Sequence, residues 1–514
     1  MKKIVSILLA LAMILSLNVT AFATTLTIAD DAADRSYNGY KLLDLTVGLK
    51  PDCGCDAGAD HNDDCYNYSY TVNSTYLYIL QAETYAYGED KPESASDVTS
   101  EQILAYLSSL SSDSGDSYGT LRAAADRIYR NIQAASITAD APGLTDTTTI
   151  DQGYWLFADV TNLDGENEAN SLVVVDTKGL ESLTIAPKTG LPTVEKKVKD
   201  TNDTTGVTTD WQDAADHDIN DTVEFKLTAT MPENLAYYKK YAISFHDTMS
   251  AGLTLDVNSI KVYAGTEDVT DQFVLPTAAD GTFTVSCANV LALTGVTVTA
   301  DTVFVVTYSA TLNENAVIGA AGNPNEVYLE FSNNPYTDGT GETERDQVIV
   351  FTYQLTINKT DGEGKPLKGA GFTLSKKNSS GVYVAVGAEL TAEDMTTFVW
   401  KGLDDGEYKL AETTVPDGYN KMDDIAFTIS AEHSQTADAP SLISLTSTLG
   451  TVQVDEATRA LTGVIEDSIE NKTGIILPET GAGGTMMLIT VSTMFVMVAA
   501  VFMVTRKKMS VYED

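Results

Sequence analysis

Alternation of apolar and polar residues dominates the chain beyond residue 190 and predicts short β-strands. In residues 222–231 every second side chain is apolar, which is the period of a strand with one buried face. Gly, Asn and Asp cluster between such runs, as in the turns of antiparallel sheets. We therefore expect two tandem Ig-like β-sandwiches, over residues 188–351 and 352–472. The strands predicted there are 194–198, 222–231, 241–245, 259–263, 283–285, 302–312, 327–331, 347–351, 354–359, 371–376, 397–399, 406–412, 424–429 and 463–470.

Residues 24–187 show a mixed pattern. Apolar residues recur at helical spacing in residues 100–110 and 118–135, with Ser100 expected as the N-cap of the first helix. An opening strand is predicted at 37–43, and further strands at 153–160 and 171–176. The fold class is therefore mainly β, with an α+β N-terminal domain before the sandwiches.

Both ends of the chain have the pattern of an exported precursor. Residues 1–23 combine two N-terminal lysines, an apolar core and an A-x-A cleavage motif, which predicts a secretory signal peptide. Apolar residues 485–505 are long enough to cross a bilayer, and the basic residues 506–508 after them should stay in the cytoplasm. The bulk of the chain is then expected outside the cell.

The net charge of −41 makes the exported surface strongly acidic, which disfavours binding to nucleic acid. Four cysteines in a chain of 514 residues do not make a disulfide framework. Cys53, Cys55 and Cys65 with His61 could form a zinc site, but the C-x-C spacing and the export route favour one disulfide and a leftover thiol. We therefore expect no metal and no cofactor. Cys287 alternates with apolar residues and is expected to be a buried free thiol.

One lysine in the last domain falls on the apolar face of its predicted strand. Lys359 shares that face with Leu355 and Ile357, and Glu412 points inward from its own strand. A buried ammonium is costly, so burial favours a neutral amine beside a protonated acid. The amine can then attack the carboxamide of Asn471, ammonia leaves, and an isopeptide bond joins the first strand to the last. The alternative is a solvated Lys–Glu salt bridge.

These residues lie in a pattern that resembles the collagen-adhesin B-type domain. The resemblance implies that Lys359 and Asn471 are the bonded pair and that Glu412 is the promoting acid. The matching segments are Ile357-x-Lys359-x-Asp361, Gly364-Lys365-Pro366-Leu367-x-Gly369-Ala370-x-Phe372, Tyr408-x-Leu410-x-Glu412-Thr413-x-x-Pro416-x-Gly418-Tyr419 and Asn471-Lys472.

The middle domain resembles the fimbrial isopeptide-formation family of pilin domains. Alternation selects Lys196, because Lys197 points the other way, but it does not separate Asn325 from Asn333. The family pattern implies Asn325 as the partner and Asp247 as the acid, and ordinary surface roles are the alternative. The matching segments are Pro192-Thr-Val194-Glu-Lys196-Lys-Val198, Phe245-His-Asp247-Thr-Met249-x-x-Gly252-Leu253 and Asn323-Pro-Asn325-Glu-Val327-x-Leu329-Glu-Phe331-Ser-Asn-Asn-Pro335.

Residues 473–514 resemble the cell-wall sorting signal of Gram-positive surface proteins. Residues 477–481 read LPETG, and the apolar span and basic tail follow. The resemblance implies that a sortase cuts between Thr480 and Gly481 and passes Thr480 to an amine. A plain membrane anchor is the alternative. The motif residues are Leu477, Pro478, Glu479, Thr480 and Gly481.

Lys188 follows Pro187 between the first two predicted domains, where it should be exposed. Its position resembles that of the pilin-motif lysine of backbone pilins, which receives the sorting threonine of the next subunit. Alanine and threonine replace the motif's tyrosine and asparagine. An ordinary linker lysine is the alternative.

The resemblances imply the shaft subunit of a covalently polymerised, wall-anchored pilus that supports adhesion. Its expected partners are a pilin-class or housekeeping sortase, identical subunits, minor or tip pilins, peptidoglycan and a host surface ligand. A monomeric wall-anchored adhesin with a sandwich stalk is the second hypothesis. An enzyme in the first domain is disfavoured, since the chain has four histidines and no G-x-S-x-G or H-E-x-x-H motif.

Overall fold

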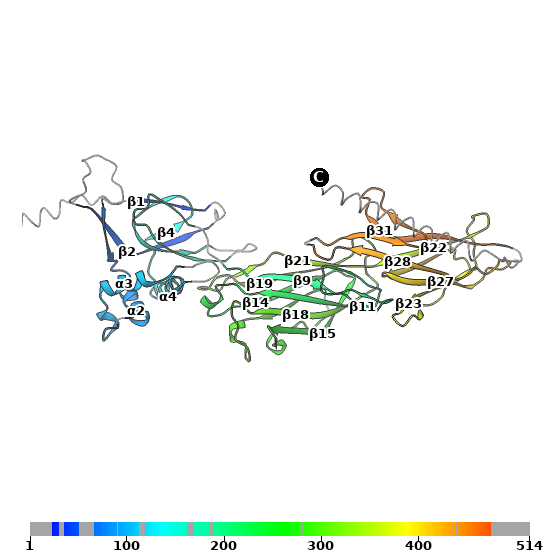
Figure 1. The fold of residues 1–514 in the computed structure, drawn as a ribbon, viewed down its shortest axis with the longest axis horizontal. Helices are drawn as coiled ribbons and strands as arrows, with labels where there is room; N and C mark the ends of the chain where they lie inside the picture. The colour runs from blue at the N-terminus through cyan, green and yellow to red at the C-terminus, as the bar shows by residue number, and fades with distance from the viewer. Residues whose placement is uncertain are drawn as a thin grey trace, which may run out of the picture.

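Three β-rich units follow one another along the long axis of the molecule (Figure 1). The computed structural model describes residues 23–29, 35–50, 66–89, 91–112, 119–161, 169–185, 190–278, 281–437 and 439–473. We call residues 23–185 the N-terminal unit, 190–351 the middle unit and 352–473 the C-terminal unit. This arrangement confirms the predicted class, mainly β with tandem sandwiches after a mixed unit. The domain boundaries stay a prediction.

The N-terminal unit packs three helices against a sheet of order β3-β2-β6-β7 with β4 on β2, beside a small sheet of order β5-β1-β8. Ile103, Ile128 and Ile132 bury the inner helix faces against strand residue Leu156. The bounds are β1 Ala23–Ile28, β2 Tyr37–Leu49, β3 Tyr66–Val72, α2 Leu77–Tyr87, α3 Ser100–Ser109, α4 Thr120–Ala134, β4 Ala141–Leu144, β5 Thr148–Asp151, β6 Gly153–Asp159, β7 Leu172–Asp176 and β8 Ser182–Ile185.

The two predicted helices are present, but three details of the N-terminal prediction are wrong. The N-cap of α3 is Thr99 and not Ser100, because the Thr99 hydroxyl accepts the Gln102 N–H while the Gln102 side chain accepts the Thr99 N–H. Strand β1 precedes the predicted opening strand and pairs in parallel with β8. Helix α2 was not predicted, because Glu83 lies on its buried face while Tyr78 and Tyr87 are exposed, which hides the helical period.

The middle unit is a sandwich of two sheets, ordered β12-β21-β19-β14-β17, with β20 on β19, and β16-β15-β18-β13-β9. Its core gathers alternate residues of the long strands, such as Phe225, Phe245 and Val306. The bounds are β9 Thr193–Val198, β10 Thr201–Asn202, β11 Val207–Thr208, β12 Ala214–Asp216, β13 Thr222–Thr230, β14 Ile243–Met249, β15 Leu253–Ala264, β16 Glu267–Asp268, β17 Thr282–Cys287, β18 Val303–Leu312, β19 Asn323–Ser332, β20 Thr340–Glu342 and β21 Asp346–Phe351.

The C-terminal unit is a second sandwich, with sheets β26-β22-β31-β30 and β24-β23-β27-β28-β29, where β25 joins β23. Antiparallel pairing alone was expected, yet the first and last strands, β22 and β31, are parallel neighbours. The bounds are β22 Tyr353–Asp361, β23 Gly371–Lys377, β24 Tyr383–Ala385, β25 Leu390–Thr391, β26 Thr397–Leu403, β27 Gly406–Thr414, β28 Ile425–His433, β29 Leu442–Ser447, β30 Thr451–Val454 and β31 Leu461–Asn471.

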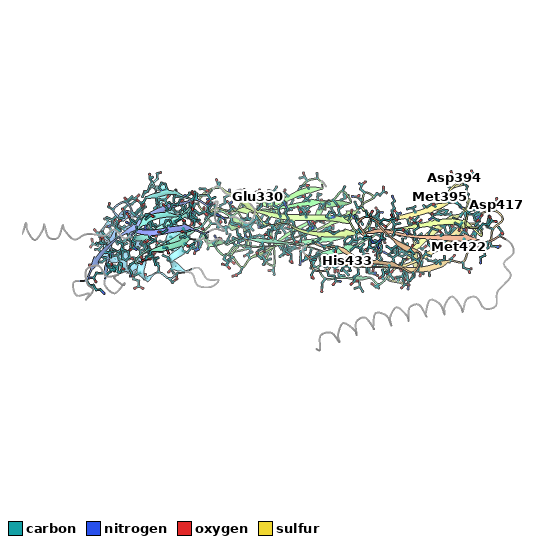
Figure 2. The ribbon with its side chains drawn as sticks, turned by 90° about the horizontal axis from the view of Figure 1, so that it is seen from above. Glu330, Asp394, Met395, Asp417, Met422 and His433 are labelled. Carbon is teal, nitrogen blue, oxygen red and sulfur yellow. The ribbon has the colours of Figure 1, made fainter. Side chains whose placement is uncertain are left out.

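The middle and C-terminal units share packing at their junction. Ala214 and Phe351 of the middle unit belong to the apolar core of the C-terminal unit. Figure 2 places His433 near this junction and Met422 at the far end of the C-terminal unit. The long strands of both sandwiches run roughly along the long axis of the molecule (Figure 1).

Candidate functional site

Lys196 lies in the core of the middle unit, as the alternation of β9 predicts. Lys196 is fully buried. Lys197, on the other face of the strand, lies nearer the surface, where its Nζ is 2.5 Å from Asp213 Oδ1 and 3.0 Å from Glu195 Oε1. Strand β9 forms one edge of its sheet, opposite β19 of the second sheet. The long side chain therefore crosses the sandwich interior.

The Lys196 amine contacts both the predicted acid and one predicted asparagine. Lys196 Nζ lies 2.5 Å from Asp247 Oδ2 and 2.6 Å from Asn325 Oδ1, and all three residues are fully buried. Tyr308 completes the cluster: its hydroxyl donates to Asp247 Oδ2 at 2.7 Å and accepts from Asn325 Nδ2 at 2.9 Å. The amine of Lys196, the carboxyl group of Asp247 and the amide of Asn325 are therefore all hydrogen-bonded within this cluster.

Burial sets the protonation of this cluster. It lowers the pKa of the Lys196 amine to about 8 although Asp247 opposes the shift, and it raises the pKa of Asp247. The second Asp247 oxygen, Oδ1, is buried and has no hydrogen-bond partner in the described part of the chain. Both observations favour a neutral amine beside a protonated acid. This pair can attack and protonate a carboxamide.

The structure separates the two asparagines that alternation left open. Asn333 donates through Nδ2 to the Thr340 carbonyl at 2.8 Å, and its own carbonyl accepts the Asn170 N–H of the N-terminal unit. It therefore lies at the junction with the N-terminal unit, whereas Asn325 lies against Lys196. Tyr308 was missed, although its inward position in the alternating strand β18 was a usable signal.

The second predicted trio is buried in the C-terminal unit but is arranged differently. Glu412 Oε1 accepts Asn471 Nδ2 at 2.7 Å, and Glu412 Oε2 accepts the Met422 N–H at 2.9 Å. Lys359 Nζ instead donates to two backbone carbonyls, of Ile469 at 3.0 Å and Thr360 at 3.2 Å. The acid therefore holds the amide, while the amine lies beside them without a direct hydrogen bond to either.

Burial lowers the pKa of the Lys359 amine to about 8, against the opposing charges of Glu412 and Glu470. Asn471 Oδ1 is buried and accepts no hydrogen bond from the residues the structure describes. An unsatisfied carbonyl oxygen next to a buried amine is costly, so a rotation of the Lys359 side chain towards Asn471 would be favoured. The three side chains can then react as in the middle unit.

The remaining predicted sites fall outside the described residues. They are Lys188, the motif residues Leu477 to Gly481, and Cys53, Cys55 and Cys65. Within the described part of the chain, no helix combines the length and the apolar character that crossing a membrane requires. Cys287 is a buried free thiol, as predicted, and burial raises its pKa.

Two acidic groups at the middle–C-terminal junction were not predicted. In each group the ligand-type atoms lie within 4.8 Å of one another. In the first group His433 itself lies against Asp200 and Asp216, and in the second the Lys376 amine pairs with Asp218. Residues from two units meet here, so no local sequence signal marks them. The groups are Asp200, Asp216 and His433, and Asp203, Asp218, Asp221 and Asp404.

The fold and these sites define an elongated protein of tandem β-sandwiches with lysines buried beside acids and asparagines. Residues 219–335 match the family model of the Gram-positive pilin backbone subunit 2, Cna-B-like domain, and residues 353–440 match that of the SpaA prealbumin-like fold domain. The middle unit therefore contains a segment that matches a Gram-positive pilin backbone domain, and the C-terminal unit contains one that matches a prealbumin-like fold domain.

Individual relatives carry similar descriptions. The chain is 25% identical over 274 residues to the trypsin-resistant surface T6 protein of Streptococcus pyogenes serotype M6, a match of 48% of this chain and 47% of the relative. It thus spans about half the length of that relative. The solved T6 backbone pilin of serotype M6 S. pyogenes aligns with 88% of this chain and 98% of its own at 16% identity and a TM-score of 0.49. The major pilin SpaD of Corynebacterium diphtheriae aligns with 65% and 86% at 18% identity and a TM-score of 0.41.

Proposed function

We propose that the protein is a structural shaft subunit of a covalently polymerised pilus on a Gram-positive cell surface. The observation that carries the proposal is the buried contact of Lys196 with Asp247 and Asn325, inside a segment that matches a pilin backbone domain. The match of the next unit to a SpaA domain supports it. Any chemistry of the protein is then on itself.

Two intramolecular isopeptide bonds stiffen the subunit in this proposal. Lys196 is joined to Asn325, promoted by Asp247, and Lys359 is joined to Asn471, promoted by Glu412. Each bond forms when the amine attacks the side-chain carbonyl carbon and ammonia leaves. The contacts between amine, acid and amide in the middle unit support the first bond, and the shared burial of the second trio supports the other.

The subunits are joined by a sortase, which cuts after Thr480 and transfers it to Lys188 of the next subunit. Sortases, identical subunits and peptidoglycan are therefore the partners, with minor or tip pilins and a host surface ligand beyond them. Tension that enters at Lys188 would cross the two isopeptides and leave at Thr480. A covalent bond then replaces strand hydrogen bonds worth about 1 kcal/mol each along that path.

Substitution of Lys188 tests the polymer. Wall extracts from cells with Lys188→Ala should lose the high-molecular-weight ladder of covalent multimers, while Lys178→Ala, an exposed lysine of the N-terminal unit, should keep it. Immunoblots after boiling in detergent separate the two results. A ladder that survives Lys188→Ala would overturn the linkage, and a single band in the wild type would favour the monomeric adhesin.

Mass spectrometry tests the isopeptides independently of the polymer. The mass of the exported chain should be lower than its sequence mass by about 17 Da for each bond, one ammonia apiece. A tryptic digest should contain branched peptides that join Lys196 to Asn325 and Lys359 to Asn471. A mass equal to the sequence value would overturn both bonds.

A further inference from the structure

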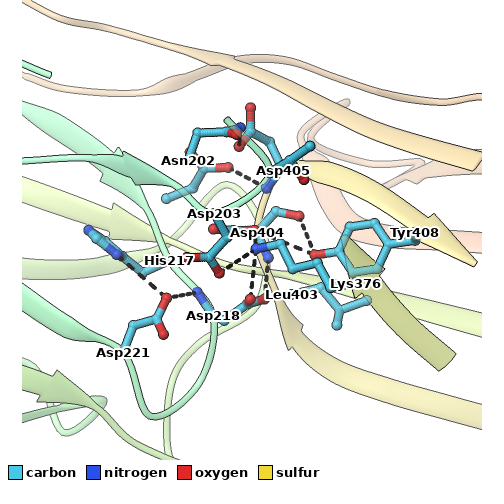
Figure 3. A network of polar contacts seen from close by, with 12 residues as sticks. Asn202, Asp203, His217, Asp218, Asp221, Lys376, Leu403, Asp404, Asp405 and Tyr408 are labelled. Atoms are coloured by element: carbon cyan, nitrogen blue, oxygen red, sulfur yellow. Dashed lines mark hydrogen bonds and ion pairs between the residues drawn. The ribbon is translucent and has the colours of Figure 1, made fainter. Parts of the chain in front are cut away.

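A third lysine is buried where the middle and C-terminal units meet (Figure 3). Lys376 lies on β23 with its side chain 7% exposed, and its amine forms ion pairs with three carboxylates. It contacts Asp404 of its own unit, and it reaches Asp218 at 2.7 Å and Asp203 at 2.9 Å across the junction. One amine therefore bridges two units.

This cluster repeats the parts of the Lys196 site. Tyr408 donates its hydroxyl to Asp404, at 3.0 Å to the backbone carbonyl and 3.4 Å to Oδ1, as Tyr308 donates to Asp247. Asp404 Oδ2 is buried with no hydrogen-bond partner among the described residues, as is one oxygen of Asp247. Each lysine amine also lies near the face of its tyrosine ring, at 5.7 Å for Lys376. Asp404 thus occupies the place of the promoting acid.

Asp218 occupies the place that Asn325 has in the middle unit. Its Oδ2 faces the Lys376 amine at 2.7 Å, and its Oδ1 accepts the backbone N–H of Asp404 at 2.9 Å. A backbone N–H in this position stabilises the negative charge that develops on a carbonyl oxygen under attack. The backbone N–H of Asp218 in turn donates to Asp221 Oδ2 at 3.0 Å, and this bond fixes the loop between β12 and β13. The carboxyl carbon of Asp218 is therefore held for attack by Lys376.

We propose that Lys376 and Asp218 condense into an amide bond that covalently joins the C-terminal unit to the middle unit. The new bond forms between Nζ of Lys376 and Cγ of Asp218. The bond that breaks is Cγ–Oδ2 of Asp218, and the oxygen leaves as water. The ammonium and the carboxylate together contain every atom of the amide and one water, so no further reagent is needed. Nζ gives up two protons between the ammonium and the amide, and Asp404 accepts each in turn and passes it to the leaving oxygen.

The electrostatics of the cluster are consistent with this step. Burial raises the pKa of Asp404 well above its ordinary range and that of Asp218 to about 6, so each carboxylate readily accepts a proton from the amine. Burial would lower the pKa of Lys376, but Asp404 and Asp218 outweigh it and raise the pKa. The amine therefore becomes nucleophilic only when it passes a proton to one of the carboxylates that it already contacts.

The position of the cluster favours the condensation step. The reacting groups are held together by the fold, which replaces an encounter in solution by a unimolecular step. The cluster borders a cleft of about 710 Å³ between the two units, into which the released water can leave. The bond goes beyond the proposed function, because it would make the junction rigid whether or not Lys188 and Thr480 are joined.

Peptide mapping of the full chain tests the bond. Trypsin should release peptide 200–226, which contains Asp218, joined to peptide 369–377, which contains Lys376. The branched species should weigh about 18 Da less than the two peptides together, one water, against about 17 Da at each Lys–Asn bond. Fragment ions should place the branch on Asp218, and not on Asp203 or Asp221 of the same peptide.

Three variants distinguish the bond from an ion network. Asp218→Ala and Lys376→Arg should each abolish the branched peptide, and Lys376→Arg keeps the positive charge for folding. Asp203→Ala removes the most exposed partner of Lys376 and should retain the branch. Cleavage after Lys376 in the wild type, or a branch to peptide 402–409 through Asp404, would overturn the proposal. Loss of this branch with both Lys–Asn branches intact would leave the proposed function standing.

Discussion

The two predicted isopeptide sites use the same residue types but divide them differently between the sheets. In the middle unit the amine comes from one sheet, through Lys196 on β9, and the acid and amide come from the other, through β14 and β19. In the C-terminal unit Lys359 and Asn471 share one sheet on the parallel neighbours β22 and β31, and Glu412 comes from the other sheet. One bond would therefore cross the sandwich and the other would join two strands side by side.

Strand register accounts for the different orientation of the two amines. Lys359 pairs with Ile469 and Asp361 pairs with Asn471, so the amine and its amide are two residues apart along the strands. The Lys359 amine consequently finds the carbonyl of Ile469 first. In the middle unit Lys196 and Asn325 lie on different sheets, so no strand pairing offsets them, and the Lys196 amine contacts Asn325 directly. The same chemistry is thus pre-organised in one unit and needs a side-chain rotation in the other.

Asp247→Ala should have the largest effect, because it breaks the better organised site. The variant should lack the bond from Lys196 to Asn325 and be about 17 Da heavier at that site. It loses the constraint on a loop of more than a hundred residues, about 5 kcal/mol, and leaves a buried amine without its acid, at a further cost of about 3–5 kcal/mol. Denaturant unfolding measures the sum, with exposed Asp301→Ala as the control. A variant that still loses one ammonia at this site and unfolds like the wild type would contradict the assignment.

Glu412→Ala should remove the second bond with a smaller loss of stability. The loop constraint is similar, about 5 kcal/mol, but Lys359 keeps its contacts with the carbonyls of Ile469 and Thr360. The mass deficit relative to the variant's own sequence mass should shrink by one ammonia, and the branched peptide of Lys359 should disappear. Glu393→Ala on the exposed surface is the matched control. A larger destabilisation than that of Asp247→Ala would contradict the difference drawn between the sites.

Tyr308→Phe should slow the first bond without preventing it. The hydroxyl lies between Asp247 and Asn325, and its loss removes hydrogen bonds worth about 1–3 kcal/mol, a slowing of roughly tenfold to a hundredfold. Mass spectra of chains sampled at intervals after synthesis follow the loss of ammonia. The bond from Lys359 to Asn471 in the same chains is the internal control. Equal slowing of both bonds would show a general folding defect instead.

The part of the fold that the sequence predicted correctly came from the alternation of apolar and polar residues along the strands. It located most strands after residue 190 and turned Lys196 and Lys359 inward, where the structure has them buried. Such patterns describe one strand at a time. They carry no information on which strands become neighbours, so the parallel pairing of β22 with β31 was missed.

The contacts between the middle and C-terminal units could not be predicted from the sequence. Lys376 lies on an ordinary strand, and Asp218 and Asp404 stand in turns more than 180 residues apart. A charged residue in a turn predicts only exposure. Beside these side chains Ile219 of the middle unit packs directly against Gly402 of the C-terminal unit and fills the space that a Cβ would need there. Only the docking of the two sandwiches creates the cluster.

His433 gives the smallest expected effect and tests the junction apart from both lysine sites. Its Nε2 lies 3.2 Å from Asp200 Oδ2 and 3.4 Å from Asp216 Oδ1. Burial would lower the pKa of His433, but the two carboxylates outweigh it and raise the pKa to about 9. Lys196 and Lys359, once bonded as amides, do not titrate in this range.

A folded pKa above the unfolded value of about 6.5 fixes the sign of the effect. The stability from His433 is fully present below pH 6.5 and is lost as the pH rises through 9, by about 1–2 kcal/mol. The melting temperature should therefore fall between pH 6.5 and 9.5 in the wild type and fall less in His433→Gln. Lys178→Ala, far from the junction, should behave as the wild type. Identical profiles for wild type and His433→Gln would mean that the protonated imidazole does not hold the two sandwiches together.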